Sequence, residues 1–143
     1  MRAGTENLPA IVGMGKAAEL AGTALGEDST SIICLRDKMI EALKHRISGV
    51  RINGEMAERL PGHVHITVDG IDSSLVMMQL DMMGIAASSG SACAAGAAER
   101  SHVIRAMGIC GENQADIRFS LGVMNTYDEI LKTVEALAKI IGQ

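Results

Sequence analysis

The sequence of 143 residues is long enough for one domain with a substantial hydrophobic core. Hydrophobic residues make up 48% of it and charged residues 21%, as in ordinary soluble globular proteins. The net charge of −4, the lack of a Lys/Arg-rich block and the aromatic content of 1% argue against nucleic acid or an anionic membrane as a partner. Because the sequence has neither a bilayer-length apolar run nor a signal-peptide pattern, we expect a cytoplasmic protein.

The first part of the chain predicts two helices. After a polar opening through Asn7, Pro9 suits the first turn of a helix that ends near Gly22 to Gly26. A second helix is expected from about Asp28 or Ser29 to Ile47. Cys34 falls within the apolar pattern of this second helix, so we expect its side chain to be buried.

Three strands and three further helices follow. Val50 to Asn53 indicates a short strand, and His63 to Val68 alternates between an apolar face and a polar face, as a half-buried strand does. Asp116 to Leu121 alternates in the same way. Helices are expected from Asp72 to about Met83, from Ser101 to Met107, and after the capping box that Thr126 forms with Glu129. The sequence therefore predicts a single α+β domain over residues 1–143, with a small, largely antiparallel sheet covered by helices.

One cysteine stands in a run of small residues, Ser88-Ser89-Gly90-Ser91-Ala92-Cys93-Ala94-Ala95-Gly96. Such a run buries too little apolar surface to offset the entropy of ordering it, which favours a mobile loop that carries the Cys93 thiol. The alternative is a cysteine that merely sits in a glycine-rich turn. The three cysteines are too few and too scattered for a disulfide framework, and the pattern assigns no role to Cys110.

Three other features could carry chemistry. Arg118 on its strand could hold a carboxylate in a bidentate fork, or could be a solvated arginine on an exposed sheet face. Gly4-Thr5 before a helix could bind phosphate, or could be an ordinary cap. His63 and His65 share a strand face and could bind a metal with Cys93 and His102, but polar residues on an outer strand face are routine, and we expect no metal.

Several segments together resemble the cysteine desulfurases of the nitrogen-fixation and iron–sulfur-assembly type, within the class V aminotransferase superfamily. The segments are Arg2 to Asn7 with Ile11 to Gly15, Ser88 to Cys93, Ser101 to Gly108 and Ile117 to Gly122. The resemblance covers only the C-terminal part of that family, the smaller domain of fold-type I pyridoxal phosphate enzymes. The family's upstream domain, with the lysine that binds pyridoxal phosphate, has no counterpart, and none of the lysines here matches that motif (Lys16, Lys38, Lys44, Lys132 and Lys139).

The resemblance implies a role for each matching residue. Cys93 would attack the sulfur of L-cysteine bound to pyridoxal phosphate and keep it as a persulfide, releasing alanine. Arg118 would bind the substrate carboxylate, and His65 stands near the active site where the family often has asparagine. Thr5 would reach the cofactor phosphate in the partner subunit of a homodimer.

The persulfide would pass to an iron–sulfur scaffold or another acceptor protein. Because the lysine domain is missing, we expect the chain alone to be inactive. Two alternatives are a non-enzymatic persulfide carrier or interaction module that kept the fold, and a small metal-binding module.

Overall fold

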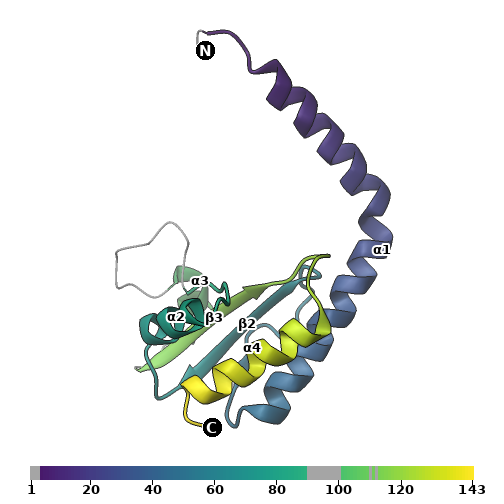
Figure 1. Ribbon diagram of the computed structural model, residues 1–143. Coiled ribbons are helices and arrows are strands. Elements are labelled where there is room, and N and C mark those ends of the chain that lie inside the picture. The colour runs from purple at the N-terminus through teal and green to yellow at the C-terminus, as the bar shows by residue number, and fades with distance from the viewer. Residues whose placement is uncertain (1–3, 90–100, 110, 112) are drawn as a thin grey trace.

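A three-stranded antiparallel sheet organises the chain (Figure 1). The computed structural model describes residues 4–89, 101–109, 111 and 113–143. Strand β1 (Arg51–Ile52) pairs with β2 (His63–Asp69), and β2 pairs with β3 (Gln114–Ser120), in the order β1-β2-β3. The long pair runs in register from His63 opposite Ser120 to Asp69 opposite Gln114. The predicted antiparallel sheet is confirmed.

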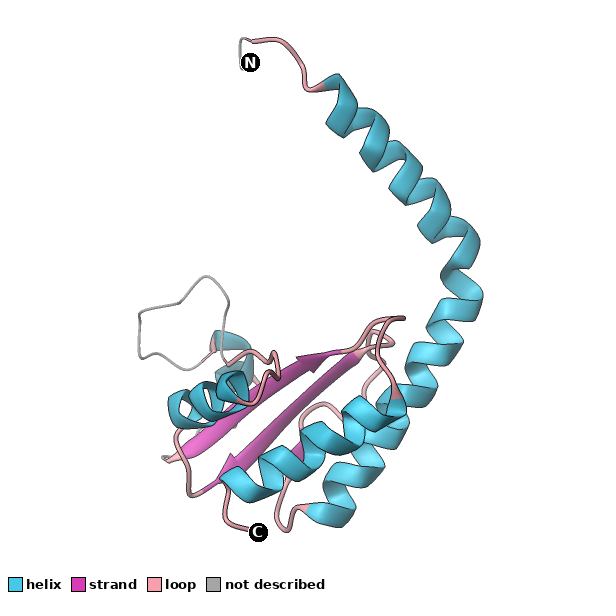
Figure 2. Cartoon of the chain, in the orientation of Figure 1, coloured by secondary structure: helices cyan, strands magenta, loops and turns pink. Residues whose placement is uncertain are grey.

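A single long helix, α1 (Leu8–Arg46), precedes the sheet, so the prediction of two helices with a break near Gly22 to Gly26 was wrong. Neither of these glycines adopts the left-handed backbone that ends a helix. A glycine inside a helix costs only about 1 kcal/mol relative to alanine, which the neighbouring turns can offset. The helix bends instead of breaking (Figure 2). The Thr30 hydroxyl donates to the Gly26 carbonyl at 2.9 Å, a contact that often bends helices.

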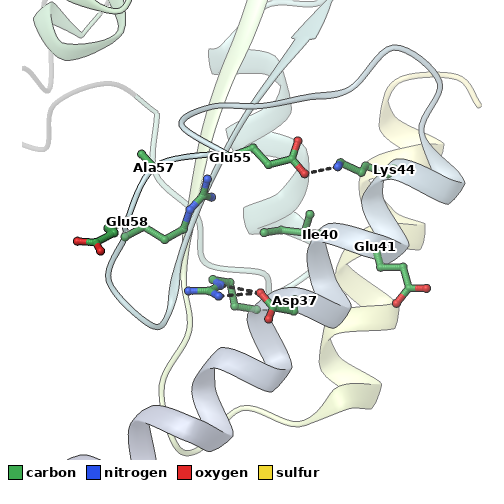
Figure 3. Close-up of a pocket in the computed structure, with 9 residues that line it drawn as sticks. Asp37, Ile40, Glu41, Lys44, Glu55, Ala57 and Glu58 are labelled. Carbon is green, nitrogen blue, oxygen red and sulfur yellow. Dashed lines mark hydrogen bonds and ion pairs between the residues drawn. The ribbon is translucent and has the colours of Figure 1, made fainter.

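The two halves of α1 lie in different surroundings. The half nearer the N-terminus extends away from the sheet (Figure 1). It leaves large apolar side chains exposed, namely Leu8, Ile11, Val12, Met14, Leu20 and Leu25. The other half packs against the sheet through Met39 and Leu43, and its Lys44 forms an ion pair with Glu55 (Figure 3). Cys34 is exposed, contrary to prediction, because it precedes the first buried residue of the helix.

The remaining helices follow the predictions closely. They are α2 (Ser73–Met82), α3 (His102–Ala106) and α4 (Tyr127–Ile140). The Asp72 carboxylate caps α2 by accepting from the backbone N–H of Ser74 at 2.8 Å. Thr126 and Glu129 form the predicted capping box at the start of α4. Of the helices that the structure describes, none combines the length and the apolar character needed to cross a membrane.

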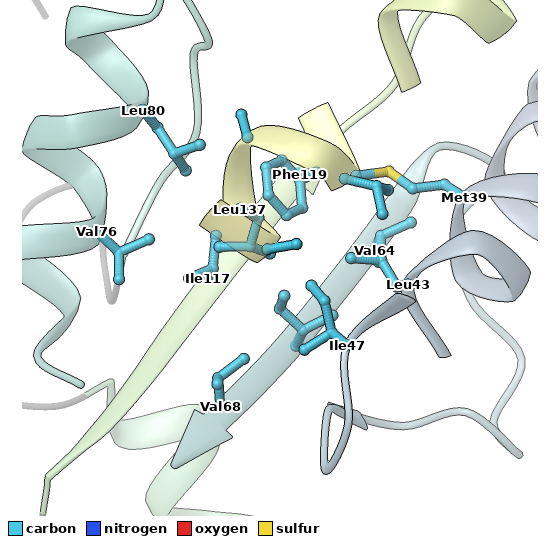
Figure 4. Close-up of a cluster of buried hydrophobic side chains, with 14 of the residues drawn as sticks. Met39, Leu43, Ile47, Val64, Val68, Val76, Leu80, Ile117, Phe119 and Leu137 are labelled. Atoms are coloured by element: carbon cyan, nitrogen blue, oxygen red, sulfur yellow. The ribbon is translucent and has the colours of Figure 1, made fainter. Parts of the chain in front are cut away.

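One face of the sheet carries the hydrophobic core. Val64 and Ile66 on β2 alternate onto this face with Ile117 and Phe119 on β3, and all four side chains are buried. Helices α1, α2 and α4 cover them (Figure 4), with Ile47 directly after α1. The buried side chains of the helices are Met39, Leu43, Val76, Leu80, Ile130, Val134 and Leu137.

The opposite face of the sheet is polar, but it is not a plain solvent face. Thr67 is 0% exposed and Asp116 is 4% exposed, although both belong to the polar sides of their strands. His65 and Arg118 are half-buried on the same face. The alternation of polar and apolar residues was predicted correctly, whereas the burial of Thr67 and Asp116 was not.

Candidate functional site

Four backbone segments meet in one row on the polar face. Asn53, just beyond β1, donates its backbone N–H to the His65 carbonyl at 2.8 Å. His65 lies opposite Arg118 in the register of β2 and β3. On its other side, Arg118 pairs with Ser88: the Arg118 N–H donates to the Ser88 carbonyl at 2.7 Å, and the Ser88 N–H donates to the Arg118 carbonyl at 3.0 Å. The row is therefore Asn53, His65, Arg118 and Ser88.

This hydrogen-bond pattern brings the side chains of His65 and Arg118 close together. The N–H and C=O of a strand residue point to the same side, and those of Arg118 point toward Ser88. His65 and Arg118 thus form a non-hydrogen-bonded antiparallel pair, in which the Cα atoms lie about 4.5 Å apart and the side chains are nearest neighbours. A histidine and an arginine on adjacent strands therefore present their donor groups side by side.

Arg118 keeps its guanidinium available. Among the residues that the structure describes, no carboxylate lies within ion-pair distance of it. A planar guanidinium with unused donors suits a bidentate carboxylate. The sequence-based role of Arg118, to hold a carboxylate, is compatible with this geometry.

The two histidines of the face are poor bases. Burial lowers the pKa of His65 below its ordinary value; Asp116 opposes this effect, while His63 and Arg118 add to it. Burial also lowers the pKa of His63, together with the charges of Arg118 and Arg59. The two rings stack, with centroids 6.5 Å apart. Both rings are therefore biased toward the neutral form, and the positive charge that acts on both of them is that of Arg118.

A buried chain of hydrogen bonds, which the sequence analysis missed, supports His65. The Asn53 amide nitrogen lies 2.8 Å from Nδ1 of His65 and 2.7 Å from Oγ1 of Thr67. The Thr67 hydroxyl donates to Oδ1 of Asp116 at 2.6 Å. A signal for this chain was available in the two-residue alternation, which places Thr67 on the same side of β2 as His65, and Asp116 on the same side of β3 as Arg118. The alternation predicts a polar face but gives no sign that Thr67 and Asp116 are buried on it.

The other predicted site residues lie elsewhere. Thr5 is exposed before α1, whose first half extends away from the sheet, so the structure does not bring it to His65 and Arg118 (Figure 1). It does not cap the helix either, because Asn7 does. Cys93, like Cys110, lies outside the described residues. His102 is exposed on α3, and within the described ranges no three His, Cys, Asp or Glu side chains gather as metal ligands.

Two hollows in the surface do not coincide with this row. One, of about 740 Å³, lies between α1 and residues 55–59 (Figure 3). Four of its charged side chains form two ion pairs, Arg36 with Asp37 at 2.8 Å and Lys44 with Glu55. The other, of about 540 Å³, lies beside Phe119 and Ile130 on the apolar side of the sheet. Neither gathers the groups of the polar face.

A family model described as aminotransferase class-V matches residues 1–132. The chain belongs to the class-V aminotransferase family. It is 41% identical over 145 residues to a protein named cysteine desulfurase IscS from Clostridium botulinum, with 99% of this chain and 36% of that protein covered. It is 43% identical over 143 residues to a cysteine desulfurase from Cereibacter sphaeroides, with the same coverage.

Two solved structures agree with the fold. The X-ray structure of a NifS-like protein from Rickettsia africae matches with a TM-score of 0.86 at 31% identity, over 99% of this chain and 37% of that chain. A second NifS-like protein matches with a TM-score of 0.82 at 29% identity, over 98% of this chain and 35% of that one. The chain thus spans little more than a third of the length of the relatives it matches.

Class-V aminotransferases use pyridoxal phosphate, but the part of the chain that the structure describes places no lysine beside Arg118 to hold it. All five lysines are described, and none lies on the face of Arg118. Lys132 and Lys139 belong to α4 on the opposite face of the sheet. The other three lie on α1, where Lys16 pairs with Glu19, Lys38 stacks on the Tyr127 ring and Lys44 pairs with Glu55. No step of the reaction is therefore assigned to the cofactor on these residues.

Proposed function

We propose that this chain is the part of a cysteine desulfurase that binds the substrate carboxylate and carries the sulfur-accepting thiol. The net reaction transfers the sulfur of L-cysteine to Cys93, giving alanine and a persulfide. A new S–S bond forms while the Cβ–S bond of the substrate is replaced by Cβ–H, so no external oxidant is needed. Relatives named cysteine desulfurase, 38–43% identical over nearly the whole chain, support this assignment.

The observation that carries the proposal is the pairing of Arg118 with Ser88. The Arg118 guanidinium forms no ion pair with the residues that the structure describes, and two backbone hydrogen bonds join Arg118 to Ser88. Cys93 follows Ser88 by five residues, and five residues of fully extended chain span at most about 18 Å. The segment that holds the thiol is therefore tethered at the residue proposed to hold the substrate.

The roles of the residues follow from their chemistry. Arg118 binds and orients the substrate carboxylate through its guanidinium fork. Cys93 acts as the nucleophile in its thiolate form, which is the reactive form of cysteine. His65 adds a hydrogen bond beside Arg118, and Thr5 contacts the cofactor phosphate in a homodimer of the complete enzyme.

The lysine that binds pyridoxal phosphate would lie outside these 143 residues. The isolated chain should consequently bind no pyridoxal phosphate through a lysine and release no alanine from L-cysteine. The persulfide on Cys93 is then passed to an acceptor protein such as an iron–sulfur scaffold.

The test is a hybrid enzyme in which this chain replaces the aligned residues of the Clostridium botulinum relative. With pyridoxal phosphate bound, the hybrid should release alanine from L-cysteine. Cys93→Ser should abolish alanine release and persulfide formation, whereas the matched variant Cys34→Ser, at an exposed position of α1, should leave both unchanged. A folded, cofactor-loaded hybrid that is inactive, or that keeps its activity without Cys93, would overturn the proposal.

A further inference from the structure

The hydrogen bonds beneath His65 have only one consistent direction. Asp116 is a buried carboxylate that accepts from the Thr67 hydroxyl, so the single hydroxyl proton of Thr67 is already used. The contact between Thr67 and Asn53 must then have Asn53 as donor, through its amide nitrogen. This choice fixes the orientation of the Asn53 amide, because its NH₂ end faces both Thr67 and His65.

The same amide nitrogen reaches Nδ1 of His65 at 2.8 Å. An NH₂ group has only donors to offer, so Nδ1 must be the acceptor and carries no proton. A neutral imidazole with a bare Nδ1 has its proton on Nε2. We infer that Asn53, Thr67 and Asp116 are positioning residues that hold His65 at neutral pH as the Nε2–H tautomer, an uncharged hydrogen-bond donor beside Arg118.

Burial and charge around the ring agree with this assignment. The chain Asn53–Thr67–Asp116 is buried, with exposed fractions of 9%, 0% and 4%, so water cannot readily replace a lost partner. The groups that face His65 are Asp116 and Arg118 on β3, His63 on β2 and the Asn53 amide beyond β1. Burial, His63 and Arg118 all lower the pKa of His65, and only Asp116 raises it.

The Nε2–H group remains open to a ligand. Within the described part of the chain, no residue accepts a hydrogen bond from it. The buried polar atom without a partner there is Nη1 of Arg59, so Nε2 of His65 is not fully buried. This step rests on the proposed function: if Arg118 binds the cysteine carboxylate, His65 adds a second, neutral donor. The negative charge of the cysteine carboxylate then faces one positive charge, that of Arg118, because the neutral His65 adds none.

Nitrogen-15 labelling of histidine tests the tautomer directly in the 143-residue chain without any ligand. Long-range ¹⁵N–¹H correlation spectra at neutral pH should show His65 with a proton on Nε2 and none on Nδ1. Asn53→Asp replaces the donor by an acceptor, so it should place a proton on Nδ1 and raise the pKa of His65 by about 1–3. Thr67→Val frees the Asn53 amide to turn and should give a mixture of tautomers, while Thr67→Ser should restore the Nε2–H form.

A wild-type His65 with its proton on Nδ1 would overturn the inference. So would Asn53→Asp and Thr67→Val spectra that both keep the wild-type tautomer in folded protein. These outcomes do not depend on catalysis, so they are separate from any failure of the hybrid enzyme.

The ligand role of the Nε2–H group is tested in the hybrid enzyme. The amide nitrogen of a glutamine can occupy the place of Nε2, so His65→Gln should keep the KM for L-cysteine within about twofold. His65→Leu removes the donor and should raise KM about 2- to 12-fold with kcat little changed, the range that corresponds to one hydrogen bond. Equal KM values for the Leu and Gln variants would overturn the ligand role and leave the tautomer result standing.

Discussion

The two faces of the same sheet are stabilised in different ways. The apolar face is closed by helices whose side chains fill the space over Ile66 and Ile117, and any hydrophobic residue of suitable volume would serve there. The polar face is closed by directed hydrogen bonds among Asn53, Thr67 and Asp116, in which each group needs its partner. The comparison teaches that a buried side chain on a strand can stabilise the fold through the volume it fills, or shape a site through the direction of its hydrogen bonds.

The largest effect on stability is expected on the apolar face. Ile117→Ala removes a fully buried side chain in the middle of β3 and should lower the free energy of unfolding by about 2–5 kcal/mol. Urea denaturation followed by circular dichroism measures this change. The matched variant Ile11→Ala, on the exposed half of α1, should change it by less than about 0.5 kcal/mol. Similar losses in both variants would mean that Ile117 is not part of the core.

On the polar face, stability should fall when a hydrogen-bonding group is removed without a change in side-chain volume. Thr67→Val keeps the shape of the side chain but leaves Asn53 and Asp116 without their shared partner, which should cost about 1–3 kcal/mol. Thr133→Val is the control, because Thr133 also donates from its hydroxyl, to the Glu129 carbonyl one turn earlier in α4, but is only half-buried. Its unfolding free energy should stay within about 0.5 kcal/mol of the wild type. Equal effects would show that the buried network adds no stability.

A smaller effect on stability should appear near neutral pH, where the histidines of the polar face titrate. The pKa of His65 in the folded chain is lowered from 6.5, so the unfolded chain binds more protons between that lowered value and 6.5. The contribution of His65 to stability is therefore complete above pH 6.5 and decreases as the pH falls below that value. The urea midpoint should drop between about pH 7.5 and about pH 5.5, and His65→Gln should reduce this drop.

The control for the pH experiment is His102→Gln, because His102 is exposed on α3. It should leave the pH dependence of the urea midpoint as in the wild type. A His65→Gln protein with the full wild-type pH dependence would contradict the lowered pKa of His65.

The smallest effect on stability should accompany a large effect on function. Arg118→Lys lies on the polar face without an ion pair in the described part of the chain, so the free energy of unfolding should change by less than about 0.5 kcal/mol. Lysine keeps the charge but loses the planar fork, which should weaken binding of L-cysteine in the hybrid enzyme by about 1–3 kcal/mol. An unfolded variant would instead make Arg118 a structural residue.

Local patterns in the sequence predicted much of the fold. The two-residue alternation of His63 to Val68 and of Asp116 to Leu121 identified both long strands, because a sheet with one apolar face imposes that period. Asp72 and Thr126 identified the starts of two helices, since capping is decided by residues within one turn.

Most of what failed depended on contacts between distant residues. The exposure of Cys34 depends on where α1 meets the sheet, whereas the continuity of α1 through Gly22 and Gly26 follows from the small cost of a glycine inside a helix. The chain from Asn53 to Asp116 joins residues more than sixty positions apart, and no local pattern announces it. The position of Arg118 on its strand and the resemblance to cysteine desulfurases predicted a carboxylate-binding role. Its pairing with Ser88, however, can be seen only in the folded sheet.

The unequal surroundings of α1 also predict different amide hydrogen-exchange rates in its two halves. Its 39 residues would span about 58 Å as one straight helix, and only the turns near Met39 and Leu43 are held by the core. A helical segment without tertiary contacts frays readily, since its own propensity is marginal in water. Amide protons in the outer half should therefore exchange with deuterium through local opening within the folded protein. Those around Leu43 should exchange only when the whole domain unfolds, so one continuous helix carries two widely separated exchange rates.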